Sequence, residues 1–172
     1  ETLIVISSSI FGSFFPLLSH AFKEAPTAFR QLVSQAFLGL LLIGMPIALA
    51  GSLVSRDVIL LFFGPKFAAA GLTLAILCWH TFFSFLAGLL ANILIICGRQ
   101  TVDMVISFFL VLLNISLNFY LIPRYSFHGA ALATALTELV GMSAYFIFTL
   151  RDPRIKISFP LKELALASKV NL

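Results

Sequence analysis

The hydrophobic residues of this chain form five long, nearly continuous runs separated by short polar gaps. The runs cover approximately residues 2–22, 32–55, 71–97, 102–122 and 128–150. A helix that crosses the hydrocarbon core of a bilayer needs about 20 mostly apolar residues, and each run reaches that length. Membrane-spanning strands instead alternate apolar and polar residues over about 10 positions. The pattern therefore predicts an all-α integral membrane protein with five transmembrane helices.

Two further segments are too short to cross a bilayer. The apolar run from Val58 to Phe63 is followed directly by Gly64 and Pro65, residues that commonly end helices. We expect this run to form an interfacial or re-entrant turn between the second and third spans. We expect residues 151–172 to form a cytoplasmic surface tail, because the part from Ile155 to Leu172 is weakly amphipathic; a linker to further helices is the alternative.

Small and polar residues recur within the runs at helical spacing, so each predicted helix carries one such stripe. The stripes of the third and fourth runs are Thr73, His80, Ser84, Gly88 and Asn92, and Asp103, Ser107, Asn114 and Asn118. The fifth run has two ridges, Gly129, Ala133, Thr137 and Gly141 beside Ala130, Thr134, Glu138 and Met142. The first two runs carry Ser9, Gly12, Pro16, Ser19 and His20, and Gly39, Pro46 and Ala50.

Such stripes have two explanations, and for any single stripe both stay open. Small residues allow helices to pack closely, whereas polar side chains within a membrane also line substrate cavities. The more polar members favour a cavity, so our candidates for its lining are His80, Ser84, Asn92, Asn114, Asn118 and Glu138.

Glu138 is the most costly of these residues, because it lies near the centre of the fifth run. A carboxylate at the centre of a spanning helix costs roughly 2.5–3.5 kcal/mol on insertion scales. It is our candidate for binding a coupling proton or cation, or for contacting a polar substrate. An equally weighted alternative is a structural carboxyl group that is protonated or hydrogen-bonded to a neighbouring helix.

The other ionisable residues have simpler expectations. His80 fits a satisfied core histidine better than a ligand, and Asp103, close to Arg99, fits a solvated or locally paired charge. For Arg56, Lys66 and Arg124 we expect solvation in loops, with a cationic rim for an anionic substrate as the alternative.

Composition supports the membrane assignment, since 60% of the residues are hydrophobic and only 10% are charged. Soluble domains carry roughly 25% charged residues, so a soluble globular protein is excluded. The net charge is +4, and every Lys and Arg residue lies outside the five apolar runs, which indicates membrane orientation and not a nucleic-acid partner. Cationic residues favour the cytoplasmic side, and the gaps on one side hold Lys23, Arg30, Arg99, Arg151, Arg154 and Lys156, with Lys162 and Lys169 in the tail.

That orientation places the C-terminal tail in the cytoplasm and Glu1 outside. Five spans, an outside start and no initiator methionine lead us to expect a piece of a longer protein. Catalytic patterns are missing from the sequence: there is no nucleophile–base set and no metal-ligand spacing among His20, His80 and His128. Cys78 and Cys97 fit buried apolar positions. We therefore expect a non-enzymatic protein without a metal or cofactor.

Several motifs resemble those of the polysaccharide-export (O-antigen type) flippases, which belong to the multidrug, oligosaccharidyl-lipid and polysaccharide exporter superfamily. The main one is NISLNFYLIPRYSFHGAALAT, Asn114 to Thr134. Others are Phe15-Pro16-Leu17-Leu18-Ser19, the run LFFGPKF at 61–67, and the turn Gly98-Arg99. Their order and spacing carry the resemblance over nearly all of residues 1–150. One departure is Ser126, which stands where a glycine commonly follows the tyrosine.

This resemblance implies two six-helix lobes around a cavity that opens alternately to each side, with this chain as helices two to six of the second lobe. It implies a lipid-linked oligosaccharide as the substrate, in the cytoplasmic membrane, and the polysaccharide polymerase machinery as a candidate partner. Pro16, Gly64, Pro123 and Gly129 would then shape the kink and turns. The alternatives are a multidrug cation antiporter or lipid II flippase of the same superfamily, a non-transporting membrane scaffold, and a membrane-embedded glycan enzyme.

Overall fold

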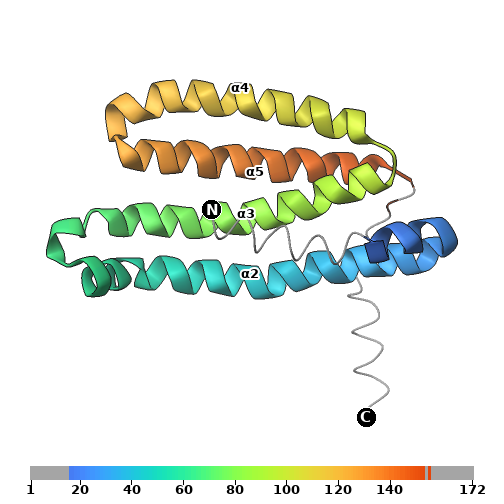
Figure 1. Ribbon diagram of the computed structural model, residues 1–172, viewed down its shortest axis with the longest axis horizontal. Helices are drawn as coiled ribbons and strands as arrows, with labels where there is room; N and C mark the ends of the chain where they lie inside the picture. Colours follow the sequence, from blue (N-terminus) through green and yellow to red (C-terminus); the bar gives the residue numbers. More distant parts are fainter. Residues whose placement is uncertain (1–15, 154, 156–172) are drawn as a thin grey trace, which may run out of the picture.

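The computed structural model describes residues 16–153 and 155, and this part of the chain is almost entirely helical. Residues 16–24 are helical and lead into α2 (Pro26–Phe63). A short 3₁₀ helix, η1 (Pro65–Phe67), connects α2 to α3 (Ala70–Ile96), which is followed by α4 (Gln100–Tyr125) and α5 (Phe127–Arg151) (Figure 1). The described residues contain no strand, which agrees with the all-α class predicted from the sequence.

The four long helices lie roughly antiparallel in the order α2, α3, α5, α4, so α5 lies between its two predecessors in the chain (Figure 1). Contacts between α3 and α4 are few by comparison. The helix ends form two groups. We call the end with the start of α2, the α3–α4 turn and the end of α5 the Arg99 end, and the opposite end, with η1 and the α4–α5 turn, the Lys66 end.

Four of the five predicted spans correspond to helices long and apolar enough to cross a membrane, namely α2, α3, α4 and α5. The predicted first span, residues 2–22, lies mostly outside the described residues. Its described part, from Pro16 onward, is helical. Most of the predicted tail, residues 151–172, also lies outside the described part.

The prediction that Val58 to Phe63 forms a separate turn is wrong, because these residues are the last turns of α2. No helix-breaking residue separates them from the second span, and Pro46 is accommodated within the helix. The helix ends only at Gly64, where φ of 82° is a left-handed value that glycine adopts readily. With 38 residues, α2 is about 57 Å long, so it extends beyond a hydrocarbon core of about 30 Å.

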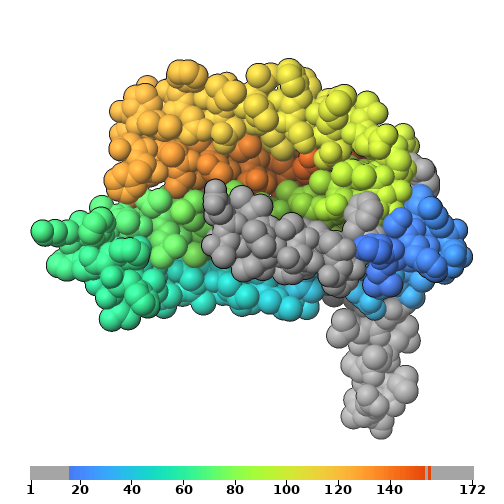
Figure 2. Space-filling model, viewed as in Figure 1, coloured from blue at the N-terminus to red at the C-terminus, as the bar shows by residue number. Residues whose placement is uncertain are grey.

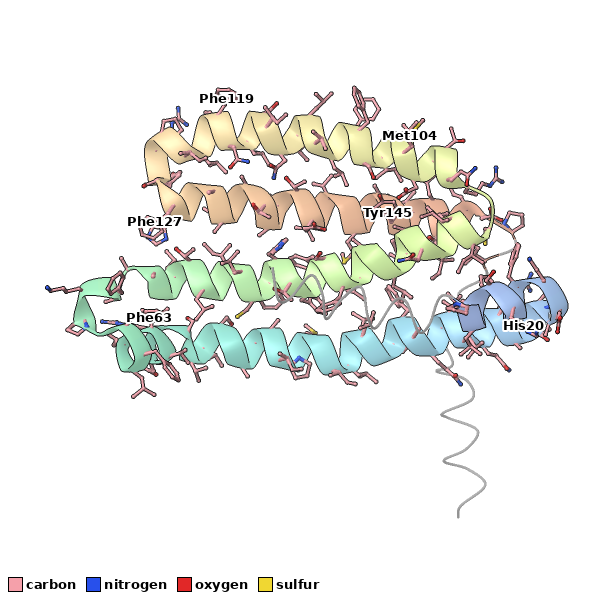
Figure 3. The ribbon with its side chains drawn as sticks, in the orientation of Figure 1. His20, Phe63, Met104, Phe119, Phe127 and Tyr145 are labelled. Carbon is pink, nitrogen blue, oxygen red and sulfur yellow. The ribbon has the colours of Figure 1, made fainter. Side chains whose placement is uncertain are left out.

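Buried apolar side chains concentrate toward the Arg99 end, where residues 16–24 pack with α2 and α3. The best buried of them are Leu18, Phe29, Val33, Leu86, Leu90, Ile93, Leu94 and Ile155. By contrast, the edge helix α4 turns large apolar residues outward: Met104 and Phe119 point away from α5 (Figure 3) and are 65% and 78% exposed. The space-filling view shows α4 forming one edge of the molecule (Figure 2). Such an apolar outer surface suits contact with lipid.

Close approach between α2 and α3 depends on a glycine near the Lys66 end. A Cβ atom added to Gly71 of α3 would lie 2.9 Å from the Arg56 Cα atom of α2. Small residues at such crossings allow the backbones of membrane helices to meet directly.

Candidate functional site

Three polar side chains meet between α4 and α5 within the apolar part of the chain. The Tyr145 hydroxyl donates a hydrogen bond to Asp103 Oδ1 at 2.8 Å, and Ser107 Oγ lies 3.1 Å from the same hydroxyl oxygen. Because the phenol has one proton, which points to the carboxylate, Ser107 is the donor in the second bond. Tyr145 is buried and Asp103 is half-buried (Figure 3). We call Asp103, Ser107 and Tyr145 the Tyr145 cluster.

A second set of polar contacts lies farther along the same two helices, toward the Lys66 end. Asn114 Nδ2 donates to Thr137 Oγ1 at 3.2 Å, and the Thr137 hydroxyl donates to the Ala133 carbonyl of its own helix. Asn118 Nδ2 lies 2.9 Å from both the side-chain oxygen and the backbone carbonyl of Asn114. The candidates Asn114 and Asn118 are therefore joined to each other and, through Thr137, to α5.

Glu138 lies near the middle of α5 and is half-buried. Glu138 precedes Tyr145 by seven residues, about two helical turns, so the two side chains lie on the same side of α5. No hydrogen bond or ion pair to Glu138 is present among the residues that the structure describes. A half-buried carboxyl group in this position is available to a proton, a cation or a polar ligand.

The α3 candidates lie apart from this arrangement. His80 is half-buried and its Nδ1 atom is enclosed without a hydrogen-bond partner. Asn92 Nδ2 donates to the Gly88 carbonyl one turn earlier in the same helix, and Ser84 is half-buried. In the described part of the chain, no hydrogen bond connects these three residues to the candidates on α4 or α5.

The sequence led us to expect that Asp103 is solvated or paired locally, close to Arg99, but the structure pairs it with another helix. Its partner is Tyr145 of another helix, whereas Arg99 Nε pairs with Asp152 Oδ2 at 3.1 Å. The reason is geometric: Arg99 lies in the turn before α4, and Asp103 lies on the face of α4 that contacts α5. Asp152 is only 4% exposed, so the guanidinium group compensates a buried carboxylate.

Tyr145 was missed because an aromatic residue in an apolar run resembles core packing. A signal was nevertheless present: the small-residue ridge of the fifth run has a spacing of four residues, and its next member after Gly141 is Tyr145. The bond between Thr73 Oγ1 and His128 Nδ1, 2.7 Å long at the Lys66 end, was also missed. His128 follows the turn closely, and its partner lies 55 residues away.

The α4–α5 turn is formed by Ser126, which has a positive φ of 52°. Pro123 lies in the last turn of α4 and Gly129 in the first turn of α5. A Cβ atom on Gly129 would overlap the Leu121 carbonyl oxygen, so this glycine lets the two helices meet directly after the turn. Of the other predicted turn residues, Gly64 ends α2 and Pro16 is the first described residue.

Among the described residues, no group of three or more His, Cys, Asp and Glu side chains is placed to hold a metal ion. Neither Cys78 nor Cys97 forms a disulfide with another residue in the described part of the chain. At the Lys66 end, the Arg124 guanidinium carbon lies 3.7 Å from the centre of the Tyr120 ring on the same helix.

Comparison with known proteins adds two findings. The MatE family model matches residues 3–120 of the chain. The capsular polysaccharide biosynthesis protein CapF of Staphylococcus aureus is 28% identical to it over 146 residues, or 84% of the chain. The matched part covers 37% of that relative's length. No solved structure matches the chain.

Proposed function

Because the chain belongs to the MatE family of membrane transporters, we propose that it is part of a flippase for lipid-linked oligosaccharides. The substrate would be a polysaccharide repeat unit, moved across the cytoplasmic membrane for surface polysaccharide biosynthesis. The observation that carries this proposal is the similarity to CapF, whose name assigns it to capsular polysaccharide biosynthesis. The four apolar helices that are long enough to span a membrane support it.

The polar residues of α4 and α5 are of the kind that such a flippase needs to carry its substrate through the membrane. A charged, hydroxyl-rich sugar–phosphate head cannot enter hydrocarbon without large desolvation costs. Transporters meet this requirement with a polar site near the middle of the membrane, between helices that move relative to one another. The Tyr145 cluster, Asn114, Asn118 and Glu138 supply hydroxyl, amide and carboxyl groups along one pair of helices.

Within this proposal, Glu138 is the residue that couples transport to an ion or proton. Its carboxyl group is half-buried and has no hydrogen-bond partner in the described residues, so binding a proton or cation would change its interactions directly. His80, Ser84 and Asn92 would contribute to the cavity from α3, where the enclosed His80 Nδ1 atom lacks a partner.

The orientation that we propose places the Arg99 end in the cytoplasm. Lys23, Arg30, Arg99 and Arg151 lie at this end, and Arg56, Lys66 and Arg124 lie toward the other. Cationic residues near the ends of spans are retained on the cytoplasmic side. The tail after α5 would then be cytoplasmic. The partners would be the lipid bilayer, the lipid-linked oligosaccharide and the polysaccharide polymerase machinery.

Complementation tests this function. The full-length gene would be expressed in bacteria that lack their own polysaccharide flippase and contain the cognate glycan pathway, and surface glycan would be measured. Restored glycan is the expected result. No restoration, with the protein in the membrane and the lipid-linked precursor present, would contradict the proposal; a gain of drug efflux in the same cells would indicate a multidrug transporter instead.

A further inference from the structure

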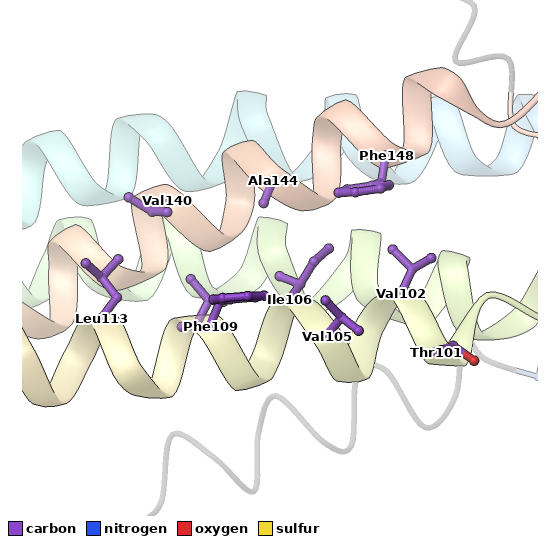
Figure 4. Close-up of a pocket in the computed structure, with 10 residues that line it drawn as sticks. Thr101, Val102, Val105, Ile106, Phe109, Leu113, Val140, Ala144 and Phe148 are labelled. Atoms are coloured by element: carbon purple, nitrogen blue, oxygen red, sulfur yellow. The ribbon is translucent and has the colours of Figure 1, made fainter.

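An apolar groove runs between α4 and α5 at the half of the hairpin nearer the Arg99 end. Its volume is about 590 Å³, within the range of roughly 300–1,000 Å³ that is typical of small-molecule sites. From α4, Val102, Val105, Ile106 and Phe109 face Val140, Ala144 and Phe148 of α5 (Figure 4). Nearly all of the lining is hydrocarbon, so the groove suits an alkyl chain and gives a sugar no hydrogen-bond partners.

A smaller cavity of about 240 Å³ adjoins the groove at the Arg99 end, and Val102 and Phe148 line both. Its remaining walls are Leu94, Arg99, Arg151 and Asp152. The carboxylate of Asp152 is already paired with Arg99, whereas the exposed Arg151 has no ion pair within the described part of the chain. The cavity therefore has one uncompensated positive charge.

We propose that the two cavities together bind an anionic glycerophospholipid of the surrounding bilayer. One acyl chain would lie in the groove between α4 and α5, and the phosphate would contact the guanidinium groups of Arg151 and Arg99. This lipid would be a bound component of the membrane, distinct from the transported oligosaccharide.

Charge complementarity supports this occupant over an uncharged lipid or another apolar helix. Guanidinium groups form paired hydrogen bonds with phosphate oxygens, and cationic side chains at the ends of membrane helices attract anionic lipids. An apolar helix would fill the groove but leave Arg151 without a counterion. An anionic phospholipid satisfies both parts, since an alkyl chain and a phosphate are joined in one molecule.

The test measures lipid binding to the purified full-length protein by native mass spectrometry, with dioleoyl phosphatidylglycerol or dioleoyl phosphatidylcholine added in detergent. The charge variant is Arg151→Gln, its conservative partner is Arg151→Lys, and its control is Lys23→Gln, an exposed cation at the same end that lines neither cavity. The groove variant is Val140→Trp. Its control is Ile147→Trp, because the two positions are 46% and 47% exposed on the same helix and only Val140 lines the groove.

We expect phosphatidylglycerol to bind more tightly than phosphatidylcholine. Arg151→Gln should weaken the first phosphatidylglycerol site about fivefold. Arg151→Lys keeps the charge but not the paired hydrogen bonds, so it should weaken that site less than Arg151→Gln does. Lys23→Gln should have little effect. Val140→Trp should weaken binding of both lipids at that site, whereas Ile147→Trp should not. Equal binding of the two lipids, or a Val140→Trp protein that is folded and binds phosphatidylglycerol as well as its control does, would overturn the proposal.

Discussion

The hydroxyl group of Tyr145 donates a 2.8 Å hydrogen bond to Asp103, 42 residues earlier in the chain. This bond joins α4 to α5, and Ser107 donates a second bond to the same phenolic oxygen at 3.1 Å. Polar groups that are excluded from water must find partners within the protein. The pairing of Tyr145 with Asp103 therefore fixes how the edge helix α4 is placed against α5.

Replacement of Tyr145 by Phe removes both bonds and keeps the ring. We expect Tyr145→Phe to destabilise the folded protein by about 1–2 kcal/mol, the range measured for polar contacts between model membrane helices. Thermal unfolding in detergent would measure the loss. Tyr120→Phe is the matched control, because Tyr120 lies exposed on α4 and its ring can still contact Arg124. Equal losses in the two variants would argue against a stabilising role for the Tyr145 hydroxyl.

The close contact at Gly129 predicts that an alanine there destabilises the protein, whereas an alanine at the control position Gly39 stabilises it. In Gly129→Ala, the added methyl group would overlap the Leu121 carbonyl oxygen and push α4 from α5, at a cost of about 1–3 kcal/mol. Gly39→Ala in α2 adds a methyl group that meets no atom within 4 Å, and should stabilise the helix by about 0.5–1 kcal/mol. Chemical denaturation in mixed micelles would compare the two; a stabilised Gly129→Ala protein would disagree with this packing.

Ser126 has a backbone conformation that favours glycine. Its φ of 52° and ψ of −131° belong to the region that glycine populates at little steric cost. We expect Ser126→Gly to stabilise the protein by about 1 kcal/mol, measured as a rise in Tm. Ser116→Gly in the middle of α4 is the control and should lower the Tm, because a glycine inside a helix costs about 1 kcal/mol. A fall in Tm for Ser126→Gly would contradict the expected relief of strain.

Glu138 links the structure to the proposed transport. Glu138→Gln keeps the shape of the side chain but cannot lose a proton, so we expect normal expression with surface glycan reduced at least tenfold in the complementation assay. Asp57→Asn, an exposed carboxylate near the Lys66 end of α2, should leave the glycan unchanged. Normal surface glycan in a well-expressed Glu138→Gln strain would leave Glu138 a structural role only.

The helices themselves could be predicted because a continuous apolar run longer than 20 residues has few alternatives in a membrane. The end of α2 was harder to predict from the sequence, because hydropathy falls at Arg56 and Asp57 whereas the helix continues to Phe63. The break at Gly64 is visible in the sequence only as a glycine–proline pair.

The partners of polar residues depend on the order of the helices in space, which the stripes do not reveal. Asn114 was predicted to face a cavity or another helix, and its bond to Thr137 requires knowing that α4 packs on α5. His80 and Glu138 could be identified as costly residues, but their separation on α3 and α5 follows from the folded arrangement. The ridge of small residues from Gly129 to Gly141 was the strongest sequence signal for the α4–α5 contact.

The position of α5 between α3 and α4 has a consequence for biogenesis. During synthesis α4 enters the bilayer before α5 exists, and its contacts with α3 are few. The side chains of Asp103 and Asn114 therefore lack their α5 partners, Tyr145 and Thr137, until the ribosome has completed Tyr145. Nascent chains that end before α5 leave these polar groups without partners in the membrane, so we expect them to be substrates of membrane quality control.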